Sequence, residues 1–342
     1  MIEASHIMIF YTVILIILVA LIFDFYNGLN DAANSVATIV STRVLTPHKA
    51  VIWAASFNFL AAFGFGVHVA TTIGKGIILP EIVTPTVILS ALLGAIIWNI
   101  FAHRNGLPIS VSHSLVGGLI GAGISASGFA SIAGSKIVTT FLFIFLAPML
   151  GFVFSLIVSV IVLNIVKKKQ PRQVDKYFRK LQLISAAAYS LGHGTNDAQK
   201  TMGIIAVLLF TTGYLGTEFY VPFWVIIISH AAIALGTYFG GWKVIRTMGM
   251  KITKLEPYQG FCAETSSALM LIGTAQAGIP VSTTHTIAGA IMGTGSTKRL
   301  SAVRWGVART LIWAWVLTIP VCLSISFTAF QLLSIITGFI PT

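Results

Sequence analysis

The chain has 342 residues, of which 56% are hydrophobic and only 9% are charged, and its mean hydropathy is +0.93. A soluble domain carries roughly 25% charged residues, so this composition excludes an ordinary soluble globule and predicts a protein whose main solvent is lipid. The net charge of +12 does not indicate nucleic-acid binding, because the basic residues lie in short loops between apolar runs, where they determine topology and face anionic lipid.

Apolar, nearly uncharged stretches follow one another along the chain and are predicted to be helices, since they lack the alternation of a transmembrane strand. At about 20 residues per crossing, the length allows on the order of ten spans and no sizeable domain outside the membrane. The fold class is therefore predicted to be an all-α polytopic membrane protein of the cell membrane. The stretches cover residues 7–23, 50–72, 84–103, 107–130, 137–166, 183–196, 219–242, 265–297 and 310–340.

A polar segment at residues 167–180 interrupts these stretches near the middle of the chain. It holds seven of the 21 Lys and Arg residues, together with Pro171. Basic loops of membrane proteins face the cytoplasm, so this linker is expected to be cytoplasmic. Its central position suggests that the chain consists of two related halves.

Two motifs recur in both halves in the same order. Residues 28–32, GLNDA, match residues 194–198, GTNDA, at an offset of 166, and residues 108–123 match 280–295 at an offset of 172. The chain is therefore predicted to be an internal duplication. Its parts are a first repeat, a basic linker and a second repeat, at residues 1–166, 167–180 and 181–342.

Corresponding loops of the two halves carry opposite charge biases. Residues 43–49 hold two basic residues and the matching 210–220 hold none, whereas residues 124–136 hold one and 296–309 hold four. An odd number of crossings per half satisfies these biases, with the linker inside the cell and both termini outside. We expect two inverted repeats of five crossings each. Re-entrant hairpins at 107–124 or 280–296 would lower that number, and in either case discontinuous helices are expected to meet at the midplane.

Ionisable residues inside a membrane cost at least about 2.5 kcal/mol each, so they are functional candidates. Asp31 and Asp197 stand out because each follows an Asn, lies close to a Gly and is related to the other by the repeat. A structural hydrogen bond or an Asp–Lys pair would also account for them. The duplication instead favours an unwound or kinked point where carbonyls, amides and a carboxylate surround a small cation or hold a proton.

Other polar residues extend this set. Helical spacing adds Asn34 to the face of Asn30, and Lys200 to the face of Asn196. Lys200 is equally suited to touch an anion or to neutralise a repeat carboxylate. Asp24 and Glu264 lack repeat partners and are predicted to be supporting or gating groups.

The second motif is rich in hydroxyl groups that follow a Pro. Their i, i+2 spacing does not keep to one face of a helix and suits an extended lead-in or the open first turn of a helix. There the hydroxyls, free backbone N–H groups and the helix dipole can converge on a tetrahedral oxyanion. Bonding back to their own helix is the alternative. The candidate oxyanion-binding residues are Ser110, Ser112, Ser114, Ser282, Thr283, Thr284 and Thr286.

His113 and His285 lie inside this motif. A hydrogen bond that fixes the shape of the hairpin is favoured for them over titration during transport. The pairs Gly117 with Gly121 and Gly289 with Gly293 have the GxxxG spacing that lets helices pack closely. We expect them to support the site by packing.

At these residues the sequence resembles the inorganic phosphate transporter (PiT) family over nearly the whole chain. The resemblance lies in GLNDAAN at 28–34, GTNDAQKTMGII at 194–205, and the PxSxSHS and PxSTTHT hairpins. The chain departs from the family pattern at Leu29 and Ala32, and Val111 replaces a hydroxyl residue in the first hairpin.

The resemblance implies a symporter, not an enzyme, that takes up inorganic phosphate by alternating access with sodium or protons. It also implies a homodimer in the lipid bilayer. Asp31 and Asp197, with Asn30, Asn34 and Asn196, would then hold the coupling ion, with sodium as the candidate metal at the two Asp residues, and the hairpin hydroxyls would hold phosphate. No other cofactor is expected.

Three other functions compete with this interpretation. Hydroxyls and helix ends could bind another oxyanion such as sulfate, and a passive anion channel would need no cation gradient. A membrane-embedded phosphatase could use a hairpin His and a neighbouring Ser, but the motifs lack an Arg to stabilise transition-state charge. Inversion symmetry, moreover, serves alternating access and has no use in hydrolysis.

Overall fold

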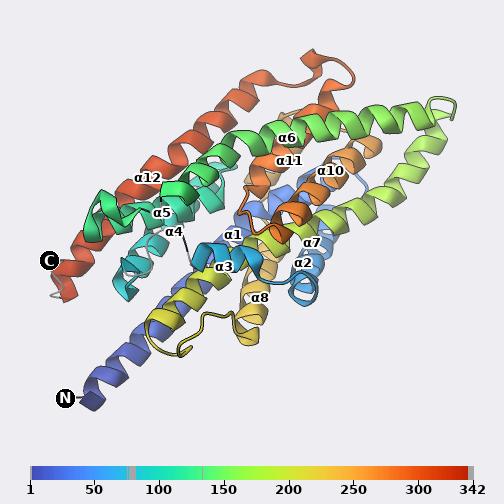
Figure 1. Cartoon of the computed structure of the whole chain (residues 1–342). Helices are drawn as coiled ribbons and strands as arrows, with labels where there is room; N and C mark the ends of the chain where they lie inside the picture. The colour runs from blue at the N-terminus through green and yellow to red at the C-terminus, as the bar shows by residue number, and fades with distance from the viewer. Residues whose placement is uncertain (1, 75, 77–81, 133, 338–342) are drawn as a thin grey trace.

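The computed structural model describes residues 2–74, 76, 82–132 and 134–337, and within them the regular elements are helices (Figure 1). This confirms the predicted all-α class. The α-helices are α1 (Ile2–Ser41), α2 (Pro47–Leu60), α3 (His68–Gly74), α4 (Pro85–Asn105), α5 (Val111–Ser127), α6 (Gly134–Val166), α7 (Pro171–Thr211), α8 (Phe223–Phe239), α9 (Trp242–Arg246), α10 (Pro257–Gln276), α11 (Thr283–Ser296) and α12 (Trp305–Thr337). Short 3-10 turns and one π-helical turn, η4 (Thr247–Lys251), connect some of them.

Local sequence explains where several helices begin and end. Proline is the first residue of α2, α4, α7 and α10, where its missing N–H costs nothing. α4 ends at Gly106, which has a φ of 65° that glycine adopts without strain. The side chains of Ser110 and Ser282 cap α5 and α11.

Four helices of the described residues are long and apolar enough to cross a membrane, namely residues 6–41, α4, residues 141–166 and residues 305–336. Two bent pairs would add one span each. α2 with η1 (Ala61–Phe63) and α3 bends by 80°, and α8 with α9 and η4 bends by 65°. By length and composition, these segments make the chain a multi-pass membrane protein.

The two hairpin helices are too short for full crossings. α5 and α11 have 17 and 14 residues, which correspond to about 25 and 21 Å at 1.5 Å per residue. Both are shorter than the hydrocarbon core of roughly 30 Å. Each also begins at a buried serine. This favours the re-entrant hairpins over two further full crossings.

The two halves interlock instead of packing as separate bodies. α12 of the second half packs on α5 of the first, and α6 of the first half packs on α11 of the second. A Cβ at Gly121 would lie 2.1 Å from Leu323 O, and one at Gly293 would lie 2.2 Å from Phe152 O, so only glycine permits these approaches. Gly117 and Gly289 make equivalent contacts. The close packing predicted from the GxxxG spacing is confirmed.

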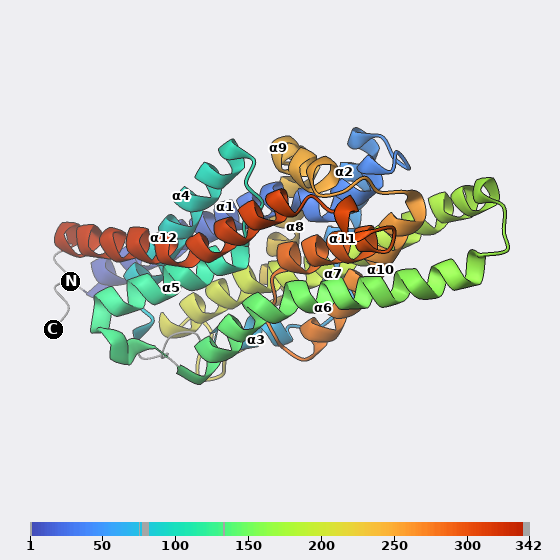
Figure 2. The same ribbon diagram turned by 90° about the horizontal axis from the view of Figure 1, so that it is seen from above.

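The start of α1 and the end of α12 lie at one end of the bundle, and the connection between α6 and α7 lies at the other (Figures 1 and 2). This is the arrangement that an odd number of crossings in each half requires. The hairpin helices α5 and α11 begin between these ends, beside the middle of α1 and α7.

Candidate functional site

The two repeat-related carboxylates meet in the interior of the bundle. The side chain of Asp31 lies on α1 and that of Asp197 on α7, and both residues are buried. Thr283 Oγ1, at the start of α11, lies 3.2 Å from Asp31 Oδ2 and 3.1 Å from Asp197 Oδ2. A hydroxyl has one proton and can donate to only one carboxylate at a time. In the second contact two oxygens face each other without a proton between them. A cation bound there would remove their repulsion.

The backbone at these Asp residues differs from the sequence-based expectation. The duplicated Asn-Asp was expected at an unwound or kinked point, but α1 and α7 are continuous helices through both motifs. The glycines serve close packing instead. A Cβ at Gly28 would lie 2.1 Å from Ile233 O, and one at Gly194 would lie 2.6 Å from Asn58 O. The expectation of unwinding was therefore wrong, because the glycines let α8 and α2 approach without breaking the helix.

Lys200 joins the carboxylates to both hairpins. Its buried Nζ donates to Asp197 Oδ1, to Ser112 Oγ in α5 and, at 3.2 Å, to Val281 O before α11. Lys200 therefore neutralises a repeat carboxylate and also reaches a hydroxyl predicted to bind the anion. Both roles that the sequence left open are compatible with this position.

Asn34 makes the corresponding contact on the other side of the site. Its Nδ2 donates to Thr284 Oγ1 at 2.9 Å. Thr284 Oγ1 in turn lies 3.2 Å from Asp31 Oδ1 and 3.2 Å from Ile109 O, in the first hairpin. Asp31, Asn34, Thr283 and Thr284 thus form one hydrogen-bonded group between α1 and α11.

The remaining hairpin hydroxyls bond to their own segments, and Ser114 can also bond to α4. Ser110 and Ser282 accept from the backbone N–H groups of His113 and His285, at 3.3 and 3.2 Å. They lie where the sequence predicted, at the first turns of the two helices. Ser114 donates to Asn99 Oδ1 at 2.9 Å or to Ser110 O at 3.3 Å. Thr286 donates to Ser282 O at 2.9 Å, which is the back-bonding alternative.

Other candidates lie apart from the carboxylates or lack partners. Asn30 donates to Asn99 O at 3.3 Å and pairs with His103 Nδ1 at 3.0 Å, so its side chain is engaged with α4. Asp24 Oδ1 accepts from Asn27 Nδ2 at 3.4 Å, one turn away on the same helix. Within the described residues, both side-chain polar atoms of buried Asn196 lack a hydrogen-bond partner, as does Asn34 Oδ1.

Glu264 is the centre of a second buried polar cluster. Its Oε1 accepts from Thr38 at 2.6 Å and from Gln182 at 3.0 Å, and its Oε2 accepts from Ser185 at 2.5 Å. Thr38 lies seven residues beyond Asp31 on α1. Glu264, on α10, is therefore bonded to side chains of α1 and α7, the helices that carry Asp31 and Asp197, without a direct contact to either Asp.

His113 and His285 face each other where the two hairpin helices begin, with ring centroids 4.6 Å apart at 75°. His285 Nδ1 lies 3.3 Å from Ile144 O on α6. Within the described part of the chain, His113 Nδ1 has no hydrogen-bond partner. His285 thus bonds to the neighbouring helix α6.

Sequence reasoning missed His193. Its Nε2 lies 3.2 Å from Asp197 Oδ2 and 3.9 Å from Asp31 Oδ2, and its Nδ1 pairs with Asn58 Oδ1 at 3.1 Å. One ligand atom from each of Asp31, His193 and Asp197 lies within 4.8 Å of the others. The spacing of four residues between His193 and Asp197 on one helix face was the available signal.

These groups suit a small hard cation. Carboxylate and hydroxyl oxygens are the ligands that such ions prefer, and Asp31, Asp197, Thr283 and Thr284 bring them together. The charged groups of this centre are the two carboxylates, Lys200 and, when it is protonated, His193. An anion close to the carboxylates is repelled by them unless cations enter with it.

An all-helical, membrane-spanning fold with a buried centre of carboxylates, hydroxyls and one ammonium is the architecture of a membrane transporter. Residues 27–326 match the phosphate transporter family, and the chain belongs to it. This confirms the family predicted from the motifs, and the prediction that the chain is not an enzyme.

Individual relatives agree with this membership. A probable low-affinity inorganic phosphate transporter of Rhizobium meliloti is 60% identical, over 91% of this chain and 93% of the relative. A Bacillus subtilis protein of the same description is 41% identical, over 94% and 97% of the two chains. A solved structure described as the sodium-dependent phosphate transporter matches with a TM-score of 0.85 at 28% identity, and the match covers 95% of this chain and 100% of that one.

Proposed function

We propose that this chain is a secondary active transporter that carries inorganic phosphate across the cell membrane together with a coupling cation. One observation carries the proposal, namely the contact of Thr283 Oγ1 with both Asp31 and Asp197. It ties the start of a hairpin helix, where an oxyanion can bind, to the carboxylates that can bind a cation. Family membership and the phosphate-transporting relatives support phosphate as the substrate.

The coupling ion is proposed to be sodium, held by Asp31 and Asp197 with Thr283 and Thr284. The solved relative is described as sodium-dependent, and oxygen ligands of this kind support a metal cation. A proton on one carboxylate is the alternative. Asn34 Oδ1 and the unpartnered amide of Asn196 are further groups that a bound ion or substrate could satisfy.

Phosphate is proposed to bind between the starts of α5 and α11. Ser112, Lys200 and the backbone N–H groups of the first helical turns can donate to its oxygens. Ser110, Ser114, Ser282 and Thr286 stay predicted phosphate ligands, although their hydroxyls are engaged locally. Using them would require that these bonds be exchanged for bonds to phosphate.

Coupling follows from electrostatics. An inside-negative membrane potential opposes anion uptake by about 2.3 kcal/mol per elementary charge per 100 mV, and the carboxylates of the site repel an anion. Cations that enter with phosphate offset both terms. We further propose that the linker at 167–180 is cytoplasmic, that both termini are extracytoplasmic and that the two repeats are inverted. The homodimer stays a prediction from the family resemblance.

The test is uptake of radiolabelled phosphate into proteoliposomes of the purified chain under an inward sodium gradient, an inward proton gradient or neither. We expect concentrative uptake with the sodium gradient alone. Concentrative uptake with only the proton gradient would identify the proton as the coupling ion and would still support symport. Equilibrative uptake in all three conditions would contradict coupling and indicate a channel. An excess of sulfate should leave the uptake of labelled phosphate unchanged.

A further inference from the structure

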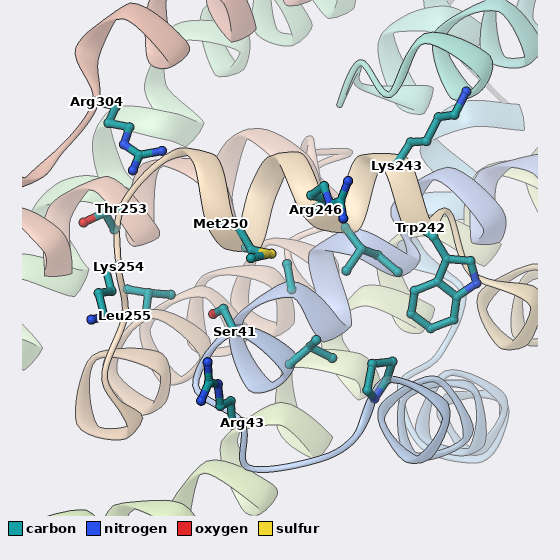
Figure 3. A pocket seen from close by; sticks show the side chains of 15 residues that line it. Ser41, Arg43, Trp242, Lys243, Arg246, Met250, Thr253, Lys254, Leu255 and Arg304 are labelled. Carbon is teal, nitrogen blue, oxygen red and sulfur yellow. The ribbon is translucent and has the colours of Figure 1, made fainter.

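A cavity of about 700 Å³ opens between the end of α1, the start of α2 and the segment formed by α9 and η4 (Figure 3). Its volume lies within the range of roughly 300–1,000 Å³ of small-molecule sites. Arg179 of α7 donates to Arg43 O at 3.0 Å, which ties the rim of the cavity to the end of the bundle that carries the basic linker. Asp31, Asp197 and Thr283 do not line it.

The cavity wall is strongly basic. None of the described residues that line it is acidic, and the basic ones are Arg43, Lys243, Arg246, Lys254 and Arg304. They come from four separate segments, after α1, in α9, after η4 and before α12. Topology signals need only lie on one side of the membrane. Their convergence on one concave surface is an additional feature that topology does not require.

These cations have no ion-pair partner within the described part of the chain. The acidic groups there that form ion pairs with Lys or Arg pair with Arg179, Lys200 and Lys298 instead. Of the five pocket cations, only Lys243 donates a side-chain hydrogen bond, to Arg104 O at 2.9 Å. The others leave their donors to solvent or to a ligand, and their like charges repel one another.

Arg43 follows the end of α1 and reaches the cavity from there. Its φ of 58° belongs to the left-handed cap of that helix, in which Val44 N–H donates to Ile39 O at 3.1 Å. Figure 3 shows Arg43 and Arg304 reaching toward the cavity from opposite walls.

We propose that this pocket binds a phosphate-bearing polyanion that also has an apolar portion. Guanidinium groups match phosphate oxygens in pairs, and several unpaired cations call for more than one negative charge. Val40, Trp242 and Leu255 supply apolar wall. An anionic lipid headgroup and a soluble organic polyphosphate share this chemistry. The site is separate from the transport site and does not depend on the transported ion.

The test uses the full chain in phospholipid nanodiscs in sodium-free buffer, with two probes. Inorganic tripolyphosphate is titrated by calorimetry into discs of phosphatidylcholine alone. In parallel, phosphatidylglycerol retained by the chain is counted by native mass spectrometry from mixed discs. The pocket variant combines Arg43→Gln, Arg246→Gln and Arg304→Gln. The matched control, which removes the same charge from the linker, combines Lys167→Gln, Lys168→Gln and Lys169→Gln.

We expect the pocket variant to lose tripolyphosphate affinity or retained phosphatidylglycerol at least tenfold, and the linker variant to change either by less than twofold. Loss of tripolyphosphate affinity alone identifies a soluble ligand, and loss of retained phosphatidylglycerol alone identifies a lipid headgroup. Equal effects of the two variants on both probes would overturn the proposal. A second variant, Arg43→Gly, removes one cation while keeping the fold, because glycine adopts the same φ freely. It should also weaken binding. Absence of phosphate uptake would leave these results unchanged.

Discussion

Asn34 Nδ2 lies 2.9 Å from Thr284 Oγ1, and Lys200 Nζ donates to Ser112 Oγ at the equivalent point of the other half. Asn34 and Lys200 are related by the offset of 166 residues, and Ser112 and Thr284 by that of 172. The two repeats therefore make the same contact with different chemistry, an amide in one and an ammonium in the other. Asp197 has a lysine partner as a result, whereas Asp31 has none among the described residues.

This asymmetry predicts different consequences for the two carboxylates. Asp31→Asn should reduce sodium-coupled phosphate uptake at least tenfold with little loss of protein, because it removes charge from the proposed ion site and leaves no buried lysine unpaired. Asp197→Asn should reduce both uptake and the amount of folded protein. The measurement is proteoliposome uptake normalised to protein abundance. Asp175→Asn, which alters an exposed Asp paired with Arg179, is the matched control, and near-normal coupled uptake in both site variants would contradict these roles.

Variants of Lys200 test whether its buried ion pair with Asp197 stabilises the fold. Removing one partner of such a pair typically costs about 3–5 kcal/mol, whereas removing both costs far less. Lys200→Gln should therefore lower the thermal unfolding temperature of the purified protein, and adding Asp197→Asn should restore much of it without restoring uptake. Lys298→Gln, which breaks an exposed pair with Glu256, should shift it little, since such pairs contribute about 0–1 kcal/mol. A double variant no more stable than Lys200→Gln would argue against mutual neutralisation.

The hydroxyl of Thr283 is predicted to hold the ion site together. Thr283→Val keeps the shape but removes the contact with Asp31 and Asp197, and losing such a bond to a buried charge costs about 1.5–3 kcal/mol. We expect the sodium concentration for half-maximal uptake to rise about tenfold or more. Thr274→Val is the control, because Thr274 donates only within its own helix. If Thr283→Val left the sodium dependence of uptake unchanged, Thr283 would not be part of the ion site.

The glycines of the hairpin helices are predicted to be intolerant of a methyl group. Gly121→Ala would place a Cβ 2.1 Å from Leu323 O on α12, so it should lower the unfolding temperature and the amount of protein in the membrane. Gly273→Ala is the matched control, because a Cβ on this exposed residue of α10 meets nothing within 4 Å. It should be neutral or stabilising by up to about 1 kcal/mol. Equal stability of the two variants would contradict the close approach of α5 and α12.

The sequence duplication related Asp31 to Asp197 and assigned both to one ion, because a repeat relates positions without any knowledge of helix packing. Thr283 was predicted to bind phosphate, and its contact with both carboxylates was not foreseen, since its repeat counterpart Val111 has no hydroxyl. The sequence could not show that α1 and α7 stay helical, since a glycine that permits close packing and one that permits unwinding look alike in sequence. It also missed His193, whose contacts with Asp31 and Asn58 join residues far apart in the chain.

The interlocked hairpins impose an order on the assembly of the protein. The backbone of α5 at Gly117 and Gly121 packs against α12, whose residues are the last of the described chain to leave the ribosome. The first hairpin therefore has to wait in the membrane without its final neighbour while about two hundred further residues are made. Until then the glycine face of α5 lacks its final neighbour, so the packing around the binding centre is completed only when α12 has been made.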